Sequence, residues 1–224
     1  TCHLYLLHPP GGIVGGDTLD ISVRLDAKSH ALITMPGASK FYRSNGPLAC
    51  LSQHFYLDEE ATLEWLPQDT IIFPGANAAL RSVFHLHATS TLLAWELYCL
   101  GRPVINETFS HGTLENRLEV WVDGEPRLIE RLHLSGGDLT PVADHPWVGT
   151  LLFYPAREAL LDAVRALLAP LENVGGATLT DDLLSVRFLS HDNLICQRVM
   201  RDIWQSLRPL LTSKTACSPR IWQT

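Results

Sequence analysis

The chain has 224 residues, a hydrophobic fraction of 46% and a formal net charge of −7. This length is enough for one domain, or two small ones, with a sizeable apolar core. The mild negative charge argues against binding nucleic acid or an anionic membrane surface through charge. No apolar run reaches the ~18 residues that a membrane-spanning helix needs. The 5 cysteines are scattered without a Cys-x-x-Cys pair, which favours a reducing, cytoplasmic setting over a disulfide framework or a zinc cluster.

The first segment, TCHLYLLH (1–8), reads as a strand, yet the chain begins at Thr1 without Met. We therefore expect the natural N-terminus to lie further upstream, which leaves a targeting segment open.

The loop HPPGGIVGGD (8–17) raises the question of phosphate binding. A dinucleotide fold needs Gly-x-Gly-x-x-Gly between a strand and a helix. Here the spacing of the glycines is different, and the next segment, TLDISVRL (18–25), alternates like a strand. No Gly-Lys-Ser/Thr motif is present either. The loop is therefore predicted to be a tight turn. Asp17 is the one residue in it whose side chain could take part in binding or catalysis.

The first two thirds of the chain predict a mostly β body. Short segments with strand character recur at the ~8–12-residue spacing typical of sandwiches, barrels and β-solenoids. They lie at 18–25, 30–37, 53–58, 61–67, 70–75, 80–87, 91–101, 116–124 and 126–136. Asp123-Gly124 is the turn of a predicted hairpin.

The last third predicts two helices. AREALLDAVRALLAPL (156–171) has an apolar face and ends at Pro170. A second helix, 193–211, is capped by Asp192. The segment 178–190 between them is predicted to be one strand. The apolar stripes are Ala159, Leu160, Ala163, Val164, Leu167 and Leu168 in the first helix, and Ile195, Val199, Ile203 and Leu207 in the second. We expect a single domain over 1–224, with the β body at about 1–155 and the helical part at about 156–224.

His85 and His87 point to the same face of a predicted strand and are a candidate metal-binding pair. A cupin-type site needs an acid a few residues later, and the next acid is Glu96. We therefore favour the interpretation that His85 and His87 are exposed strand residues. The alternative is that the chain is a cupin-type metal enzyme.

Glu96 is unusual because it lies inside the apolar segment TLLAWELYCLG (91–101). A buried carboxylate needs a partner. Two readings stay open, a salt bridge to an arginine such as Arg102 or a role lining an internal polar cavity. Glu130 raises the same question, and an exposed face is favoured there. No Gly-x-Ser-x-Gly motif occurs, and no catalytic set is found.

Five longer motifs together resemble the urease accessory protein family known as UreD or UreH. They are HPPGGIVGGD, ITMPGASKFYRS, EWLPQDTIIFPGA, WELYCLGRPVINETFSHG and PRIWQT. Their order and spacing also fit, from the first residues to the last, and enterobacterial members are the nearest. Family members carry further β-strand sequence before the first motif, so this chain looks truncated at its N-terminus.

The resemblance implies a non-catalytic scaffold with a β-rich, solenoid-like body and helices. It implies that the scaffold binds apo-urease and a helical accessory protein, UreF, and through UreF a nickel-carrying GTPase, UreG. Nickel(II) is cargo that passes through a polar tunnel, and no tightly bound cofactor is expected. Neither nucleic acid nor membrane is an expected partner.

The resemblance places a polar conduit at Asp17, Ser39, Glu96 and Glu130, with Glu64 and Asp69 as second-rank candidates. The family often has Glu where this chain has Asp69. Oxygen ligands and ordered water hold nickel weakly enough for transfer, whereas clustered His or Cys would trap it. We expect the glycine loop to turn Asp17 toward an interior passage; the alternative is a turn with Asp17 exposed.

Candidate partner-binding residues are Lys40, Tyr42 and Arg43 in one loop, and Arg220 and Trp222 in the tail. Trp and Arg are enriched at interface hot spots. The alternatives are that the loop aromatics are core, that the second helix packs inward and that the tail lies on the β body. A third reading of the function is a β-solenoid that binds or cleaves carbohydrate, which predicts a groove of stacked aromatics.

Overall fold

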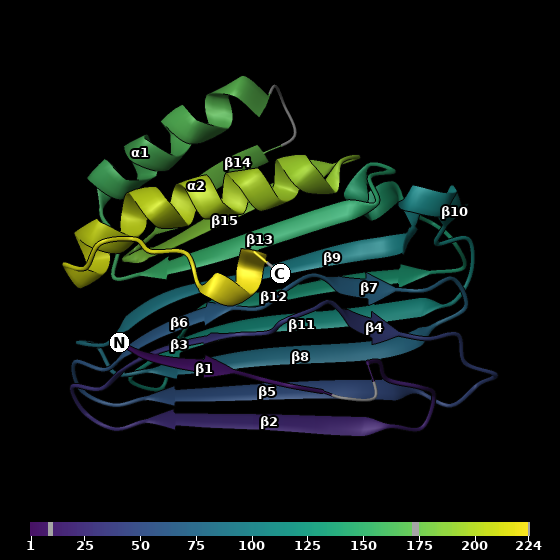
Figure 1. Cartoon of the computed structure of the whole chain (residues 1–224), viewed down its shortest axis with the longest axis horizontal. Helices are drawn as coiled ribbons and strands as arrows, with labels where there is room; N and C mark the ends of the chain where they lie inside the picture. The colour runs from purple at the N-terminus through teal and green to yellow at the C-terminus, as the bar shows by residue number, and fades with distance from the viewer. Residues whose placement is uncertain (9–10, 172–174, 224) are drawn as a thin grey trace.

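Two β-sheets lie face to face, and two helices cover the outer face of one of them (Figure 1). The computed structural model describes residues 1–8, 11–171 and 175–223. The predicted mostly β, solenoid- or sandwich-like body with two helices near the C-terminal end is confirmed.

The larger sheet has ten strands and mixed pairing. Its first four strands pair in parallel, and the next three continue antiparallel. In spatial order the main path is β1 (Cys2–Tyr5), β3 (His30–Thr34), β6 (Thr62–Leu66), β9 (Thr91–Arg102), β13 (Trp147–Tyr154), β15 (Leu183–Ser190) and β14 (Gly175–Thr180). The short strands β4 (Ser39–Phe41), β7 (Thr70–Ile72) and β10 (Glu107–Thr108) join this sheet off the main path.

The smaller sheet has five strands, four of them parallel. They are, in spatial order, β12 (Glu125–Ser135), β11 (Thr113–Val122), β8 (Asn77–Leu86), β5 (Ala49–Leu57) and β2 (Thr18–Leu25). The chain alternates between the sheets, so that β2 and β3, β5 and β6, and β8 and β9 form successive coils. This repeat is not visible in the sequence because equivalent coil positions share apolar character and not residue identity.

Strand patterns explain which faces are buried. In β5 every second residue is buried, as expected for a strand with one face on the core. In β9 the residues from Leu92 to Gly101 are all buried, because the smaller sheet covers one face and the helices cover the other.

The helices are α1 (Glu158–Leu168) and α2 (Asn193–Thr212), and they lie side by side over β13, β15 and β14 (Figure 1). The predicted cap is confirmed, since the Asp192 side chain accepts a hydrogen bond from the Leu194 N–H at 2.8 Å. Single turns of 3-10 helix occur at η1 (Pro103–Ile105), η2 (Thr140–Val142), η3 (Ala169–Leu171) and η4 (Arg220–Gln223). No helix in the described part of the chain is both long and apolar enough to cross a membrane.

Two local predictions were wrong. The segment 178–190 is not one strand but belongs to the hairpin β14–β15, because Asp181 adopts a positive φ of 53° and turns the chain. In α2 the predicted Val199, Ile203 and Leu207 are buried, but Ile195 is 40% exposed, and Cys196 and Met200 belong to the buried face.

Candidate functional site: a polar layer between the sheets

The larger sheet is interrupted at the same level in two successive coils. Four residues separate the end of β3 from the start of β4, and three separate the end of β6 from the start of β7. Each interruption contains a proline, Pro36 and Pro67, which has no N–H to give to a neighbouring strand. The long strand β9 runs past the second gap: its pairing with β6 ends at Ala94, and its pairing with β7 begins at Tyr98. Glu96 therefore lies beside a breach in the sheet.

A layer of polar side chains crosses the interior at this level. The strands β5, β8 and β11 each place one polar residue among inward-facing apolar ones, namely Gln53, Ser82 and Asn116. Gln53 and Ser82 are direct cross-strand neighbours. On the facing sheet, Glu96 is the register partner of Thr150. The layer separates two apolar clusters that fill the two ends of the sandwich.

Glu96 is held only by neutral donors. The Ser82 hydroxyl donates to its carboxylate at 2.5 Å, and the Tyr98 hydroxyl donates at 2.8 Å. Burial raises the pKa of Glu96, and hydrogen bonds from Ser82, Tyr98 and Asn116 offset only part of that rise. The salt bridge to Arg102 is excluded because Arg102 pairs with Glu107 instead.

Two cavities meet at Tyr98, and Glu96 lines the smaller of them. A small one of about 20 Å³ lies on the β6–β7 side and is lined by Ser39, Gln53, Glu96 and Tyr98 among others. A large one of about 530 Å³ lies on the β13–β15 side and is lined by Tyr98, Asn116, Glu130 and Arg187 among others. Tyr98 lines both, so its side chain forms part of the partition between them.

Glu130 lines the large cavity, and the face that was expected to be exposed is half-buried, with the side chain 34% exposed. The Arg187 guanidinium donates to both of its carboxylate oxygens, to Oε1 at 2.9 Å and to Oε2 at 2.6 Å, and joins β15 to β12 across the sandwich. The hydrogen bonds that Arg187 donates to Glu130 accordingly raise the pKa of Arg187. In this conformation Arg187 occupies the carboxylate that a cation would bind.

Ser39 and Asp69 both lie at the interruption of the large sheet. Ser39 lines the small cavity, and its backbone N–H donates to the Asp69 carbonyl at 2.9 Å. Asp69 lines a separate hollow on the helix side of the sheet together with Trp95 and Trp222. Burial raises the pKa of Asp69, against an opposing effect of the Lys40 charge. The two residues therefore lie near opposite faces of the breach.

Glu64 is fully buried but lies outside the polar layer. It faces α2, where its carboxylate accepts hydrogen bonds from Arg208 and Trp204, each at 2.8 Å. His30 contacts the same carboxylate at 2.8 Å. Although burial by itself raises the pKa of Glu64, these partners lower it to about 2. The structure thus makes Glu64 the centre of an ion network that ties α2 to β6.

Asp17 does not point into an interior passage, and that expectation was wrong. The residue is exposed, and its carboxylate accepts a hydrogen bond from the Val14 N–H at 3.1 Å. This side-chain bond closes a turn and uses the group that an inward orientation would need. Pro9 and Pro10 of the same motif lie outside the described residues.

The glycines of this loop serve close packing. A Cβ on Gly12 would lie 2.2 Å from the Tyr42 ring, and one on Gly15 would lie 2.2 Å from the Ser44 hydroxyl. Gly16 adopts a positive φ of 97°. The loop is explained by chain turning and close approach to residues 42–44, without a phosphate.

The loop residues named as partner candidates lie in β4 and directly after it. The ring of Tyr42 packs edge-on against Phe73, with centroids 5.0 Å apart. Arg43 forms an isolated bridge with Ala76. Lys40 lies in β4 and is half-buried.

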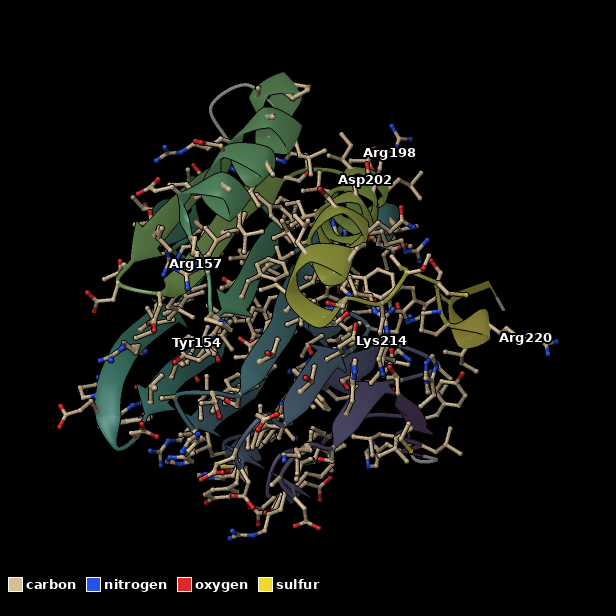
Figure 2. All side chains as sticks on the ribbon, turned by 90° about the vertical axis from the view of Figure 1, so that its left-hand side faces the viewer. Tyr154, Arg157, Arg198, Asp202, Lys214 and Arg220 are labelled. Atoms are coloured by element: carbon tan, nitrogen blue, oxygen red, sulfur yellow. The ribbon has the colours of Figure 1, made fainter. Side chains whose placement is uncertain are left out.

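The tail residues differ from each other. The Trp222 ring lies 5.5 Å from the rings of both Trp95 and Trp204, and its N–H donates to the Thr34 hydroxyl at 2.9 Å. Arg220 extends away from the body (Figure 2). The tail is therefore anchored on the β body by Trp222, while Arg220 stays accessible to a partner.

His85 and His87 do not converge. His85 stacks on Tyr56 with centroids 4.8 Å apart on the outer face of the small sheet, and Arg24 lies over the same Tyr56 ring. His87 follows the end of β8 and contacts Thr89. Among the described residues no group of three or more His, Cys, Asp and Glu side chains is placed to hold a metal.

Three polar-layer residues escaped the sequence reasoning: Gln53, Ser82 and Asn116. The sequence does mark them, because each lies at an inward-facing position of its strand, where the alternation otherwise places apolar residues. Read one strand at a time, such a residue looks like an isolated exception. The register between successive coils aligns the three residues, and no single strand shows that register.

Comparison with known proteins identifies the family. The model of the family described as UreD urease accessory protein matches residues 1–223. The chain belongs to this family. A urease accessory protein UreD from Enterobacter sp. (strain 638) is 76% identical over 224 residues, covering 100% of this chain and 82% of that protein.

More distant relatives within the UreD family carry the same name. The urease accessory protein UreD of Klebsiella aerogenes is 70% identical over 100% of this chain and 83% of its own length. That of Pseudomonas putida (strain GB-1) is 52% identical over 100% of this chain and 80% of its own length. Membership of the UreD urease accessory protein family implies a role in urease maturation.

Proposed function

We propose that this chain is a non-catalytic scaffold of urease maturation that passes nickel(II) through the interior between its two sheets. It binds apo-urease and a UreF-like accessory protein, and it receives nickel from the GTPase UreG through that protein. The cytoplasm is the proposed location. Nickel is the cargo, and no tightly bound cofactor is part of the proposal.

The observation that carries the proposal is the polar layer around Glu96. A folded protein places a carboxylate among apolar strands only at a cost in free energy, which argues for a use of that group. Here the carboxylate lines the small cavity, its partner Tyr98 lines both cavities, and the breach in the sheet lies next to it. Oxygen donors without clustered His or Cys suit a metal ion that must leave again.

The proposed route joins the large cavity to the breach. A hydrated ion enters the large cavity, where it meets the Glu130–Arg187 pair. It then passes Glu96 into the small cavity beside Ser39 and leaves toward Asp69. Asp17 is exposed at the surface and has no place in this interior route.

The partner surfaces are proposed from accessibility. Arg220 is exposed, and Lys40 acts electrostatically on Asp69 at the proposed exit, so the tail and the loop with Lys40, Tyr42 and Arg43 are the proposed partner surface. Trp222 fastens the tail, so its removal is expected to weaken partner binding through loss of tail order.

The test is the nickel content of urease. Urease and the other accessory proteins are co-expressed with and without the gene encoding this chain, and nickel per active site is measured in purified urease. We expect nickel and activity to fall without it. If urease acquires the same amount of nickel per active site without this chain, the proposal is contradicted.

A parallel variant separates the scaffold from a cupin-type enzyme. Replacing both His85 and His87 by Ala leaves maturation intact if the chain is a scaffold, because neither side chain lies in the polar layer. Loss of bound metal and of a measurable activity in that variant favours the enzyme.

A further inference from the structure

Two buried amide oxygens in the polar layer have no hydrogen-bond partner. Gln53 is 7% exposed and Asn116 is 8% exposed. The Gln53 Oε1 and Asn116 Oδ1 atoms are buried and unpaired within the described part of the chain. An unpaired buried acceptor costs roughly 1–3 kcal/mol, so two of them in one layer call for a ligand or an ordered water.

The two amide side chains line different cavities, and both are linked to Glu96. Gln53 lines the small cavity together with Glu96, whereas Asn116 lines the large cavity. Asn116 also hydrogen bonds to Glu96, and Gln53 is paired in register with Ser82, which donates to Glu96. All three oxygen-bearing side chains thus belong to one connected cluster.

The two cavities differ in the hydration that they allow. A cavity needs about 10–15 Å³ to hold one water molecule. The large cavity of about 530 Å³ therefore accommodates a hydrated ion, whereas the small one of about 20 Å³ has room for about one water. An ion that crosses from the large cavity to the small one must exchange most of its water for protein oxygens.

The local charge also favours a cation at this point. Of the three buried glutamates in the described residues, Glu64 and Glu119 are paired with arginine. Glu96 has only hydroxyl and amide partners. A positive ion beside Glu96 would supply the missing countercharge.

We propose that Gln53 and Asn116 act with Glu96 as a transient, all-oxygen binding site at which a divalent cation loses its hydration shell between the two cavities. The inference rests on the proposed function and adds to it the residues and the step. Amide oxygens bind more weakly than carboxylates, so a site with a single charge releases its ion readily.

The test adds charge to the site. In the full-length protein, Asn116→Asp and Gln53→Glu each supply a second carboxylate, and affinity for cations rises with the number of charged ligands. Equilibrium dialysis with Ni²⁺ should show at least about tenfold tighter binding for either variant, by the same dependence on ligand charge. Urease co-expressed with these variants should receive less nickel, because the ion is retained. Ser52→Asp, which places the same charge on the outer face of β5, is the matched control and should change neither quantity.

A second pair of variants removes the oxygens. Gln53→Met and Asn116→Leu keep the side-chain volume, and both should reduce nickel delivery while complex formation with urease persists. Thermal melting verifies folding, and the Gln53 variants carry the test if Asn116→Asp does not fold. Unchanged nickel binding and delivery in all folded variants overturn the site. If Glu96→Gln loses nickel delivery while the amide variants deliver nickel normally, the passage stands and this site is rejected. If Glu96→Gln delivers nickel fully, the passage itself is rejected.

Discussion

Glu64 and Glu96 are both buried carboxylates on neighbouring parallel strands of one sheet, but they face opposite sides of it. Glu64 faces α2 and is bound by Arg208, His30 and Trp204. Glu96 faces the other sheet and is bound by the hydroxyl groups of Ser82 and Tyr98. The first has its countercharge inside the protein, and the second does not.

The pKa shifts of the two groups follow this difference. Burial raises the pKa of either acid, but charged and polar partners bring that of Glu64 down to about 2, whereas that of Glu96 stays raised. A fully compensated charge is suited to hold a helix in place. An uncompensated one is a group that an incoming cation can stabilise.

The largest expected effect comes from breaking the compensated cluster. Arg208→Met removes the guanidinium and leaves Glu64 buried without its main cation, which should cost about 3–5 kcal/mol of unfolding free energy. Urea unfolding measures this loss. Glu96→Gln is the comparison, since the Gln carbonyl oxygen accepts from one hydroxyl while its amide N–H donates to the other, and its cost should stay below about 1 kcal/mol. Equal losses in the two variants would contradict the distinction.

The two acids should also give stability opposite dependences on pH. The pKa of Glu64 is lower in the folded state than in the unfolded state, so its contribution is complete above about pH 4.5 and disappears as the pH falls toward 2. The difference between 4.5 and about 2 corresponds to roughly 3 kcal/mol. The pKa of Glu96 is higher in the folded state, so its ionisation lowers stability as the pH rises above the ordinary carboxyl range.

Unfolding measured from about pH 3 to about pH 7 in the parent protein, Glu64→Gln and Glu96→Gln checks both signs. The free energy of unfolding of Glu64→Gln should be lower than that of the parent at neutral pH, and this difference should shrink toward the acid end of the range. Glu96→Gln should gain relative stability toward neutral pH. Two parallel pH profiles would show that both acids are compensated in the same way.

Single hydrogen-bond donors give the smallest effects. Trp204→Phe removes the indole N–H that donates to the charged Glu64, at a cost of about 1.5–3 kcal/mol. Tyr98→Phe removes a donor to Glu96, which can instead take up a proton, so the cost should be about 0.5–1.5 kcal/mol. Thermal or urea unfolding compares the pair, and a larger loss for Tyr98→Phe would reverse the assignment.

The sequence predicted the fold well where one period dominates. The alternation of 18–25, which forms β2, and the cap of α2 were enough for strand and helix. The β14–β15 turn was missed because Asp181 takes a positive φ that no apolar pattern signals.

The site was predicted only in part. Glu96 was recognisable because a carboxylate in an apolar strand is conspicuous by itself. Gln53 and Asn116 become meaningful only through coil register and the sheet interruptions, which are tertiary features. Asp17 was misplaced because its turn hydrogen bond to Val14 competes with the inward orientation.

The most direct test of the nickel passage is maturation with the Glu96→Gln variant. Urease is co-expressed with the other accessory proteins and either the parent protein or this variant, and nickel per active site is measured after the complexes are confirmed by co-purification. We predict that the complexes form as with the parent and that the nickel content of urease falls severalfold. Normal complexes with fully loaded urease would show that nickel does not pass Glu96.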